Sequence, residues 1–309
     1  MVNLLRAEIL RLVSDRKVVM LAGLVLLFGF WIASAMSEVL MPYSALDWDN
    51  AQRQSNDVQI SLEVACGQGG VATDCSSLPA SVTVEGFLRP QLSFEQFVIT
   101  TLGPTTQVGL FALAVLIMVM IGSEFSTGAI STQLTFTPRR APLLWAKVVA
   151  YAICGVCLAA FWTVSMVVLD AFIFLNLRGA EGLTAGASLA AQIGRALLAG
   201  LVIAVLTALM TVAVASTVKA GLLISAALVI SQFFESSKNL AQIAGLLPTT
   251  NALSLVDGEW NRARYNGDGV LSQPLMHLDY GYSLGYAAFW LVVFGIWAFV
   301  SFSRRNIIK

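Results

Sequence analysis

The sequence predicts an all-α polytopic membrane protein, and three observations lead to that fold class. The chain has 309 residues, of which 57% are hydrophobic and 12% are charged. Soluble domains carry roughly 25% charged residues, so this chain has too few polar groups to cover a folded surface in water. Long stretches without acidic or basic residues, and an uneven distribution of charge between them, are the other two observations. A soluble enzyme, a nucleic-acid-binding protein and a disordered chain are therefore excluded.

Six charge-free stretches are candidates for membrane-spanning helices. A helix needs roughly 20 apolar residues to cross the ~30 Å hydrocarbon core, and only Ala220 to Phe234 is clearly shorter. A seventh stretch, Asn239 to Val256, is too polar to face lipid. We expect one transmembrane domain made of an interfacial helix (1–17), span 1 (18–40), an extracytoplasmic cap (41–103), span 2 (104–122), an inner loop (123–146), span 3 (147–174), span 4 (190–216), span 5 (219–236), an outer re-entrant segment and loop (237–279) and span 6 (282–303).

The distribution of charged residues predicts the orientation of these spans. With the N-terminus inside, the inner segments contain eleven Lys and Arg residues and three acids, a net charge of +8. The rest of the chain contains seven bases and 15 acids, a net charge of −8. Cytoplasmic loops of membrane proteins carry an excess of Lys and Arg. Six spans therefore place both termini on the cytoplasmic side of the cell membrane.

The segment before the first span predicts an amphipathic helix in the inner interface. Four apolar residues recur at helical spacing: Val2, Leu5, Ile9 and Leu12. Glu8, Arg11 and Asp15 fall on the opposite face of the same helix. A frayed polar leader is the alternative interpretation.

The cap before the second span contains two of the four cysteines. Cys66 and Cys75 are separated by a glycine-rich loop in an oxidising compartment, which favours a disulfide bond. Ser93-x-x-Gln96 predicts a capping box that opens a short helix leading into span 2. Cys154 and Cys157 lie one helical turn apart inside span 3, and we expect them to be packing residues rather than a redox pair.

Three charged residues lie close to the predicted spans. Asp170 follows Lys147 by 23 residues, or ~35 Å along a helix, and Arg195 lies at a similar depth. We expect these two to form an interfacial ion pair, while unpaired residues or a substrate contact remain alternatives. Glu235 is a candidate for the outer end of a translocation cavity.

No catalytic constellation is evident in the sequence. His277 is the only histidine, so neither a histidine-dependent triad nor a zinc cluster is predicted. No G-x-x-x-x-G-K-[ST] motif is present to cradle a nucleotide phosphate. We expect the chain itself to be non-catalytic, with no metal and no cofactor of its own, so any ATP would be bound by another chain.

The segment between spans 2 and 3 carries the most information about function. Glu124 is the only acid on the inner side outside residues 1–17, and we expect a cation as its partner. Ser126, Thr127 and Gly128 follow and can begin a short helix parallel to the membrane, suited to contact with a cytosolic partner. Arg139 and Arg140 then form a basic turn. An ordinary positive inner loop is the alternative.

This pattern resembles the type-2 ATP-binding-cassette transporter permeases. In that family a Glu-aromatic-x-x-Gly stretch follows span 2, and a Pro-x-Arg-type turn precedes a Lys that enters span 3. The amphipathic first helix, six spans and outer helices between spans 5 and 6 extend the resemblance over the whole chain. The matching residues here are Glu124, Phe125, Gly128, Pro138, Arg140 and Lys147.

The resemblance implies the membrane subunit of an ATP-driven exporter. Two copies, or one copy and a related permease, would pair with two separate ATPase subunits that bind ATP and magnesium. Substrate identity stays open. By resemblance, the residues that couple the permease to the ATPase are Glu124, Phe125, Ser126, Thr127, Gly128, Arg139 and Arg140.

Two other classes of function fit the same composition. One is an ATP-independent secondary transporter or channel, and the other is a membrane-embedded sensor or structural protein whose outer cap binds a ligand. Neither needs an ATPase partner, so a neighbouring gene for a soluble ATPase would discriminate between them and the exporter.

Overall fold

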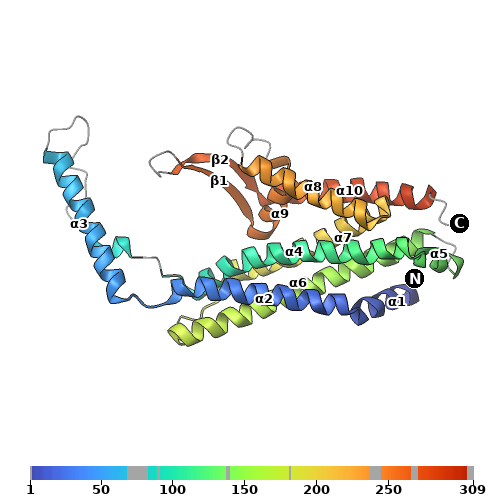
Figure 1. The fold of residues 1–309 in the computed structure, drawn as a ribbon, viewed down its shortest axis with the longest axis horizontal. Helices are drawn as coiled ribbons and strands as arrows, with labels where there is room; N and C mark the ends of the chain where they lie inside the picture. The colour runs from blue at the N-terminus through green and yellow to red at the C-terminus, as the bar shows by residue number, and fades with distance from the viewer. Residues whose placement is uncertain are drawn as a thin grey trace.

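The structure is a computed structural model that describes residues 2–67, 83–88, 91–136, 140–180, 182–236, 245–265 and 271–304. These residues form a long helical bundle, and one helix projects away from it at one end (Figure 1). The helices are α1 (Val2–Ser14), α2 (Arg16–Met36), α3 (Ala45–Gly67), α4 (Phe94–Ser126), α5 (Ala129–Phe136), α6 (Arg140–Arg178), α7 (Ala187–Val214), α8 (Thr217–Ser236), α9 (Pro248–Asp257) and α10 (Tyr280–Arg304), with 3₁₀ turns η1 (Ser37–Leu40) and η3 (Val84–Phe87) and strands β1 (Glu259–Tyr265) and β2 (Leu271–Asp279).

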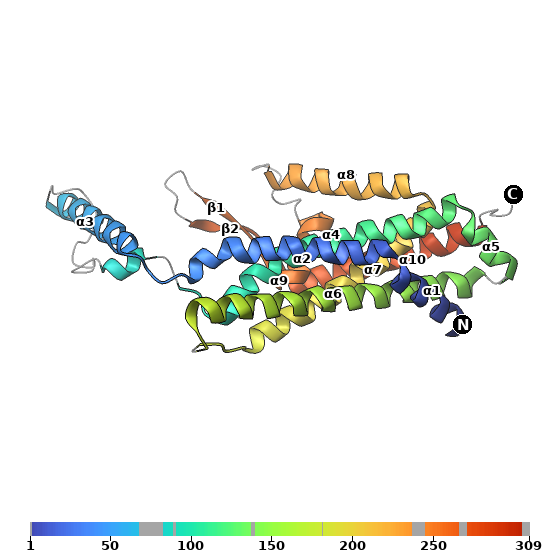
Figure 2. The same ribbon diagram turned by 60° about the horizontal axis from the view of Figure 1, so that its bottom comes forward.

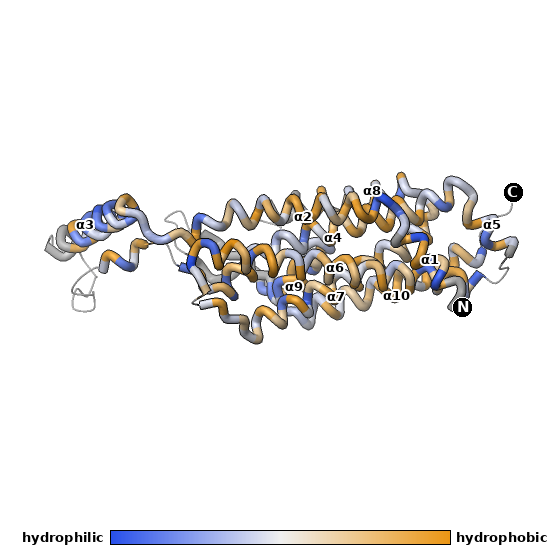
Figure 3. The backbone as a smooth tube through the Cα atoms, turned by 90° about the horizontal axis from the view of Figure 1, so that it is seen from below, coloured by the Kyte–Doolittle hydropathy of each residue, from blue (hydrophilic) through white to orange (hydrophobic). Residues whose placement is uncertain are grey.

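Among the residues that the structure describes, five helices are long and apolar enough to cross a membrane, namely α2, α4, α6, α7 and α10. They coincide with five of the six expected spans. Within α8, the apolar part is shorter and covers Thr217–Ser231, as expected from the short fifth stretch. Apolar residues dominate the tube along the bundle, whereas α3 carries many hydrophilic residues (Figure 3). The polytopic α-helical class is therefore confirmed in its coarse form, while a sixth crossing stays a prediction.

The boundaries of spans 2 and 3 differ from those expected. The capping box forms as predicted, because the Ser93 hydroxyl accepts from the Gln96 amide and the Gln96 side chain accepts from the Ser93 amide. The helix that it starts is not short: α4 runs for 33 residues through Pro104 into span 2. In the same way α6 begins at Arg140, before the expected start at residue 147, and continues to Arg178.

The bundle core is formed by α4, α6 and α7, which contact one another along their lengths. Leu113 and Ile117 of α4 and Trp162 of α6 are fully buried in it. The backbones of α6 and α7 approach closely at Gly155 and Gly200, where a Cβ on Gly155 would lie 2.8 Å from the Gly200 carbonyl oxygen. Small residues allow such close helix contacts in membranes. Figure 2 shows α8 along one edge of this core, beside α4.

The described part of the expected re-entrant segment, residues 245–265 and 271–279, contains one helix with buried polar residues and two paired strands. Pro248, at the first turn of α9, suits a helix start, and Gly258 ends the helix with φ 92°. Thr250, Asn251 and Ser254 are buried on α9, which contacts α4, α7, α8 and α10. Strands β1 and β2 then pair antiparallel, where we had expected only a loop.

The cap is only partly described. Helix α3 was not expected in it; it is polar, ends at Gly67 and lies away from the bundle (Figure 1). Cys75 lies outside the described residues, so the Cys66–Cys75 disulfide stays a prediction. Cys154 and Cys157 of α6 are free thiols.

Candidate coupling site at the α5 end of the bundle

Glu124 is buried where α4 ends, at the end of the bundle that also carries α1 and α5 and that we call the α5 end (Figure 1). Its side chain is 1% exposed. One carboxylate oxygen accepts from Arg11 Nη1 at 2.6 Å, and the other accepts from Lys147 Nζ at 2.6 Å. The expectation of a cation partner for Glu124 is thus confirmed, with one cation from α1 and a second from α6.

Lys147 extends this contact to a second acid. Its side chain is 2% exposed, and Nζ also donates to Glu8 Oε1 at 2.7 Å. Glu8 further accepts from Gln133 Nε2 of α5 at 3.3 Å, and its other oxygen lies 3.7 Å from Arg11 Nη1. We call Glu8, Arg11, Glu124 and Lys147 the four-charge cluster; it joins α1, α4 and α6, and through Gln133 it reaches α5.

The four-charge cluster is electrically balanced, with two carboxylates against two cations. Burial of an unpaired ion costs several kcal/mol, whereas paired and hydrogen-bonded ions are tolerated. Partial burial acts to lower the pKa of Arg11, but the charge of Glu124 and its hydrogen bond outweigh this and raise that pKa above its ordinary value. The guanidinium therefore stays charged, and the cluster forms an ionic link between the helices.

Sequence reasoning did not assign Glu8 and Arg11 to this site. The helical pattern of residues 1–17 placed them opposite the apolar face, where solvent was expected. In the structure Glu8 is 6% exposed and Leu12 is 4% exposed, so the edge between the two faces meets the bundle. One signal in the sequence could have identified them. Glu124 needs a cation and Lys147 needs an acid near the inner membrane surface, and residues 1–17 contain both kinds of residue.

The loop after Glu124 forms the expected short helix. Gly128 adopts φ 74°, a conformation that side-chain-bearing residues rarely adopt, and its carbonyl accepts from Ser131 at the start of α5. Ile130 and Leu134 pack α5 against the hydrophobic core. Thr132 and Thr135 are exposed on the other side.

The remaining predicted residues of the loop have distinct surroundings. Phe125 packs against the hydrophobic core from a half-buried position. Ser126 and Thr127 are exposed, and their hydroxyls donate to the Ser123 carbonyl, so they complete the end of α4. Arg139 lies outside the described residues.

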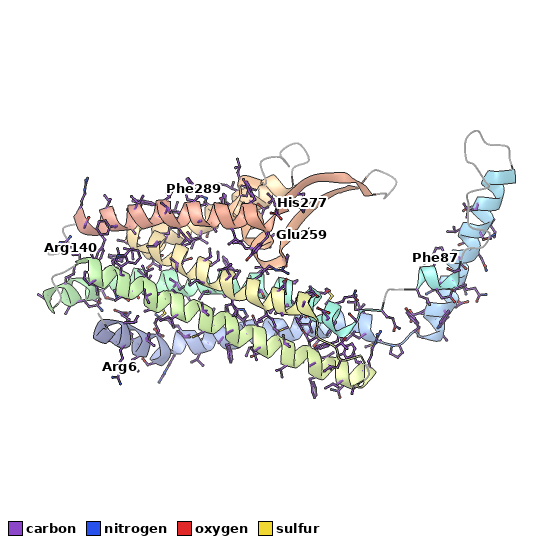
Figure 4. All side chains as sticks on the ribbon, turned by 180° about the vertical axis from the view of Figure 1, so that it is seen from behind. Arg6, Phe87, Arg140, Glu259, His277 and Phe289 are labelled. Atoms are coloured by element: carbon purple, nitrogen blue, oxygen red, sulfur yellow. The ribbon has the colours of Figure 1, made fainter. Side chains whose placement is uncertain are left out.

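Arg140 links the beginning of α6 to the end of α10. Its Nη1 donates to the carbonyl of Phe302 at 3.2 Å and to that of Ser303 at 2.9 Å, at the α5 end (Figure 4). Basic side chains stabilise the unpaired carbonyls of a helix C-terminus. Five helices, α1, α4, α5, α6 and α10, are therefore joined by polar contacts at this end.

The expected Asp170–Arg195 ion pair is wrong. Asp170 is fully buried and accepts from the Thr101 hydroxyl of α4 at 2.5 Å. Arg195 donates to Gln192 at 2.6 Å and to the Val256 carbonyl at 3.3 Å. The two residues were expected at similar depths, but their side chains point in different directions. Asp170 faces α4, whereas Arg195 faces Gln192 and the end of α9.

The acid that lies beside Arg195 is Asp257, at the end of α9. Asp257 takes a hydrogen bond from Gln192 and lies in the electrostatic field of Arg195. Desolvation raises the pKa of Asp257 above its ordinary value, and Gln192 and the charge of Arg195 oppose the rise. The hydrogen bond from Arg195 to the Val256 carbonyl links α7 to α9.

Glu235 and His277 are not part of the site at the α5 end. Glu235 lies in the last turn of α8, and its side chain is outside what the structure describes, so its cavity role stays a prediction. His277 lies on β2, away from the end of the bundle where Arg140 is labelled (Figure 4). Within the described ranges, no group of three His, Cys, Asp or Glu side chains could hold a metal ion.

Comparison with known proteins assigns the chain to a family without a described activity. Residues 90–308 match the family described as "Protein of unknown function (DUF2705)". The chain belongs to this family. No curated protein matches the chain, and no solved structure matches it. The matched region contains Glu124, Lys147 and α5, whereas Glu8 and Arg11 precede it.

Proposed function

We propose that this chain is the transmembrane permease subunit of an ATP-binding-cassette exporter and that the loop around Glu124 couples it to ATPase subunits. The observation that carries the proposal is the short helix α5 at the end of the bundle, connected to the four-charge cluster. An exporter of this class needs an element that a cytosolic ATPase can contact and a rigid link from it to the spans. Helix α5 and the cluster supply both.

The contacts suggest how a force on α5 would reach the spans. Gln133 of α5 bonds to Glu8, Glu8 bonds to Lys147 of α6, and Lys147 bonds to Glu124 of α4. A partner that binds two arrangements of these helices with different affinities shifts the population toward the one that it favours. The exposed polar side of α5 is the surface that we assign to the ATPase.

The proposal includes assembly and orientation. The substrate path lies between two permeases, either two copies of this chain or one copy and a related chain. Helices α2 and α8 have exposed apolar side chains, among them Leu24, Trp31 and Val229, which are available to a second permease or to lipid. The α5 end faces the cytoplasm, in the cell membrane, with both termini on that side.

The test is co-purification followed by ATP hydrolysis. A tagged full-length chain is expressed with the soluble ATPase encoded next to it, and the complex is purified in mild detergent. We expect the ATPase to remain bound, and replacement of exposed Thr132 and Thr135 by Arg to release it while the permease stays monodisperse. Failure of every neighbouring ATPase to bind the wild-type chain would overturn the proposal.

The alternative of an ATP-independent transporter is favoured by one observation, the buried carboxyl of Asp170. Ionisable residues inside a membrane often mark ion or substrate pathways. One oxygen of Asp170 has no hydrogen-bond partner within the described residues. If this reading holds, proteoliposomes containing the chain alone would show substrate movement driven by an ion gradient, and no ATPase would be required.

A further inference from the structure

An apolar groove lies between α1, α2 and α6, at the margin of the bundle core. Its volume is about 400 Å³. The lining includes Ile9 and Leu12 of α1, Val19 of α2, and Ile153, Cys157 and Phe161 of α6. Such a lining offers almost no hydrogen-bonding groups, so a polar substrate or a metal ion is excluded as its occupant.

The length of the groove matches one leaflet of a membrane. Along α6 the lining runs from Ala150 to Phe161, which corresponds to a rise of ~16 Å at ~1.5 Å per residue. Half of the ~30 Å hydrocarbon core is ~15 Å. The groove thus begins near the α5 end and extends to about the middle of the membrane.

Basic side chains lie at the α5 end of the groove. Arg16 and Lys17 directly precede Val18 and Val19, which line it, and both are exposed. In the part of the chain that the structure describes, neither forms an ion pair. The adjacent acid, Asp15, accepts from the Lys17 main-chain amide and caps α2. Arg6 is also exposed on α1 and projects from the bundle (Figure 4).

We propose that this groove binds one anionic phospholipid from the leaflet at the α5 end. One acyl chain occupies the apolar groove, and the headgroup phosphate lies near Arg16 and Lys17. Each basic residue near an anionic lipid surface adds to the attraction, and the groove adds an apolar contact that a flat helix surface does not offer. The inference rests on the membrane location and not on the transport function.

Binding in this groove would stabilise the position of α1. Ile9 and Leu12 line the groove, whereas Glu8 and Arg11 on the same helix belong to the four-charge cluster. A bound lipid would therefore hold α1 from the lipid side while the ion pairs hold it from the bundle side. Loss of the lipid would leave α1 attached by its ion pairs alone.

The experiment is native mass spectrometry of the purified full-length chain. Wild-type protein is incubated with phosphatidylglycerol or with phosphatidylcholine of the same acyl chains. We expect one phosphatidylglycerol to be retained preferentially. In a variant with Arg16→Gln and Lys17→Gln the preference falls, by about fivefold for each charge removed. Cys157→Trp fills the groove and abolishes retention of that lipid.

The matched control is Val164→Trp, because Val164 is exposed on α6 but does not line the groove. This variant should retain phosphatidylglycerol as the wild type does. Equal retention of both lipids by the wild type, or unchanged retention in a folded Cys157→Trp variant, would overturn the proposal. The proposal would also be overturned if the wild type were dimeric and showed no lipid preference, and if Cys157→Trp dissociated the dimer. That result would mean that a second copy of the chain fills the groove. The charge variant leaves the apolar lining intact and decides the question if Cys157→Trp does not fold.

Discussion

Glu124 and Asp170 are two acids with nearly equal burial but very different surroundings. Glu124 is 1% exposed and Asp170 is fully buried. Both oxygens of Glu124 contact cations, each at 2.6 Å. Asp170 has one hydroxyl partner at 2.5 Å, and its second oxygen has none within the described residues.

The difference teaches that burial alone does not indicate what an acid does. Removing a partner from a buried ion pair leaves an uncompensated charge and costs much more than removing a neutral hydrogen bond. In the cluster around Glu124, the loss of one charge therefore removes a partner from at least one other charge. Among the described residues Asp170 has a single, neutral partner, so a neutral amide of the same shape can replace it.

The largest expected effect belongs to Lys147→Met, which removes the cation shared by Glu8 and Glu124. Truncating one partner of a buried ion pair costs about 3–5 kcal/mol. We expect the free energy of unfolding, measured by denaturant titration in mixed micelles, to fall by about that amount. The chain should also lose the protection of α1 from proteolysis.

Arg53→Met is the control for this first prediction. Arg53 pairs with Asp49 at 2.8 Å on α3, but the two side chains are 74% and 54% exposed. Exposed pairs contribute about 0–1 kcal/mol, so this variant should unfold almost as the wild type does. If Lys147→Met were equally mild, the four-charge cluster would not be the link that we describe.

The second-largest effect is expected for Glu124→Gln. In this variant Lys147 still pairs with Glu8, and Arg11 is partly exposed to solvent. The loss of charge-assisted hydrogen bonds costs roughly 1.5–3 kcal/mol, less than for Lys147→Met. The variant should insert and bind the ATPase, yet the rate of ATP hydrolysis should no longer change when the ATPase joins the permease in proteoliposomes. If ATP hydrolysis in the Glu124→Gln variant still changed as it does in the wild type, the loop around Glu124 would not couple the permease to the ATPase.

A smaller effect is expected for Gly128→Val, which tests α5 rather than the ions. The left-handed conformation of Gly128 costs roughly 1–2 kcal/mol for a residue with a side chain. We expect α5 to reorient and coupled ATP hydrolysis to decrease while the stability of the bundle changes little. Gly23→Val is the control, because nothing lies within 4 Å of a Cβ at that position. Equal activity of the two variants would contradict a role for α5.

The comparison also shows what the sequence could predict. An isolated acid among inner basic residues predicted a partner for Glu124, because charge composition indicates which side of the membrane a residue occupies. Depth arithmetic placed Asp170 and Arg195 at similar levels but could not give the direction in which each side chain points around its helix. For the same reason the periodicity of residues 1–17 revealed two faces and not which edge meets the bundle. Pairing of β1 and β2 depends on contacts between strands that a polar, irregular sequence does not encode visibly.

The smallest effect is expected for Asp170→Asn, and it provides the strictest test of the contrast. Asparagine keeps the shape and one carbonyl oxygen, so it can still accept from the Thr101 hydroxyl. No cation loses its partner, and we expect the free energy of unfolding to change by about 1 kcal/mol or less, as for a neutral hydrogen bond. Asp170→Ala, which removes the acceptor altogether, should be more destabilising than Asp170→Asn. Both changes are measured in the same mixed micelles as Lys147→Met, and transport by the ATPase complex should persist in Asp170→Asn. If Asp170→Asn instead abolished movement of solute with stability unchanged, the carboxyl itself would be required, and the ATP-independent transporter would replace the exporter as the better explanation of this bundle.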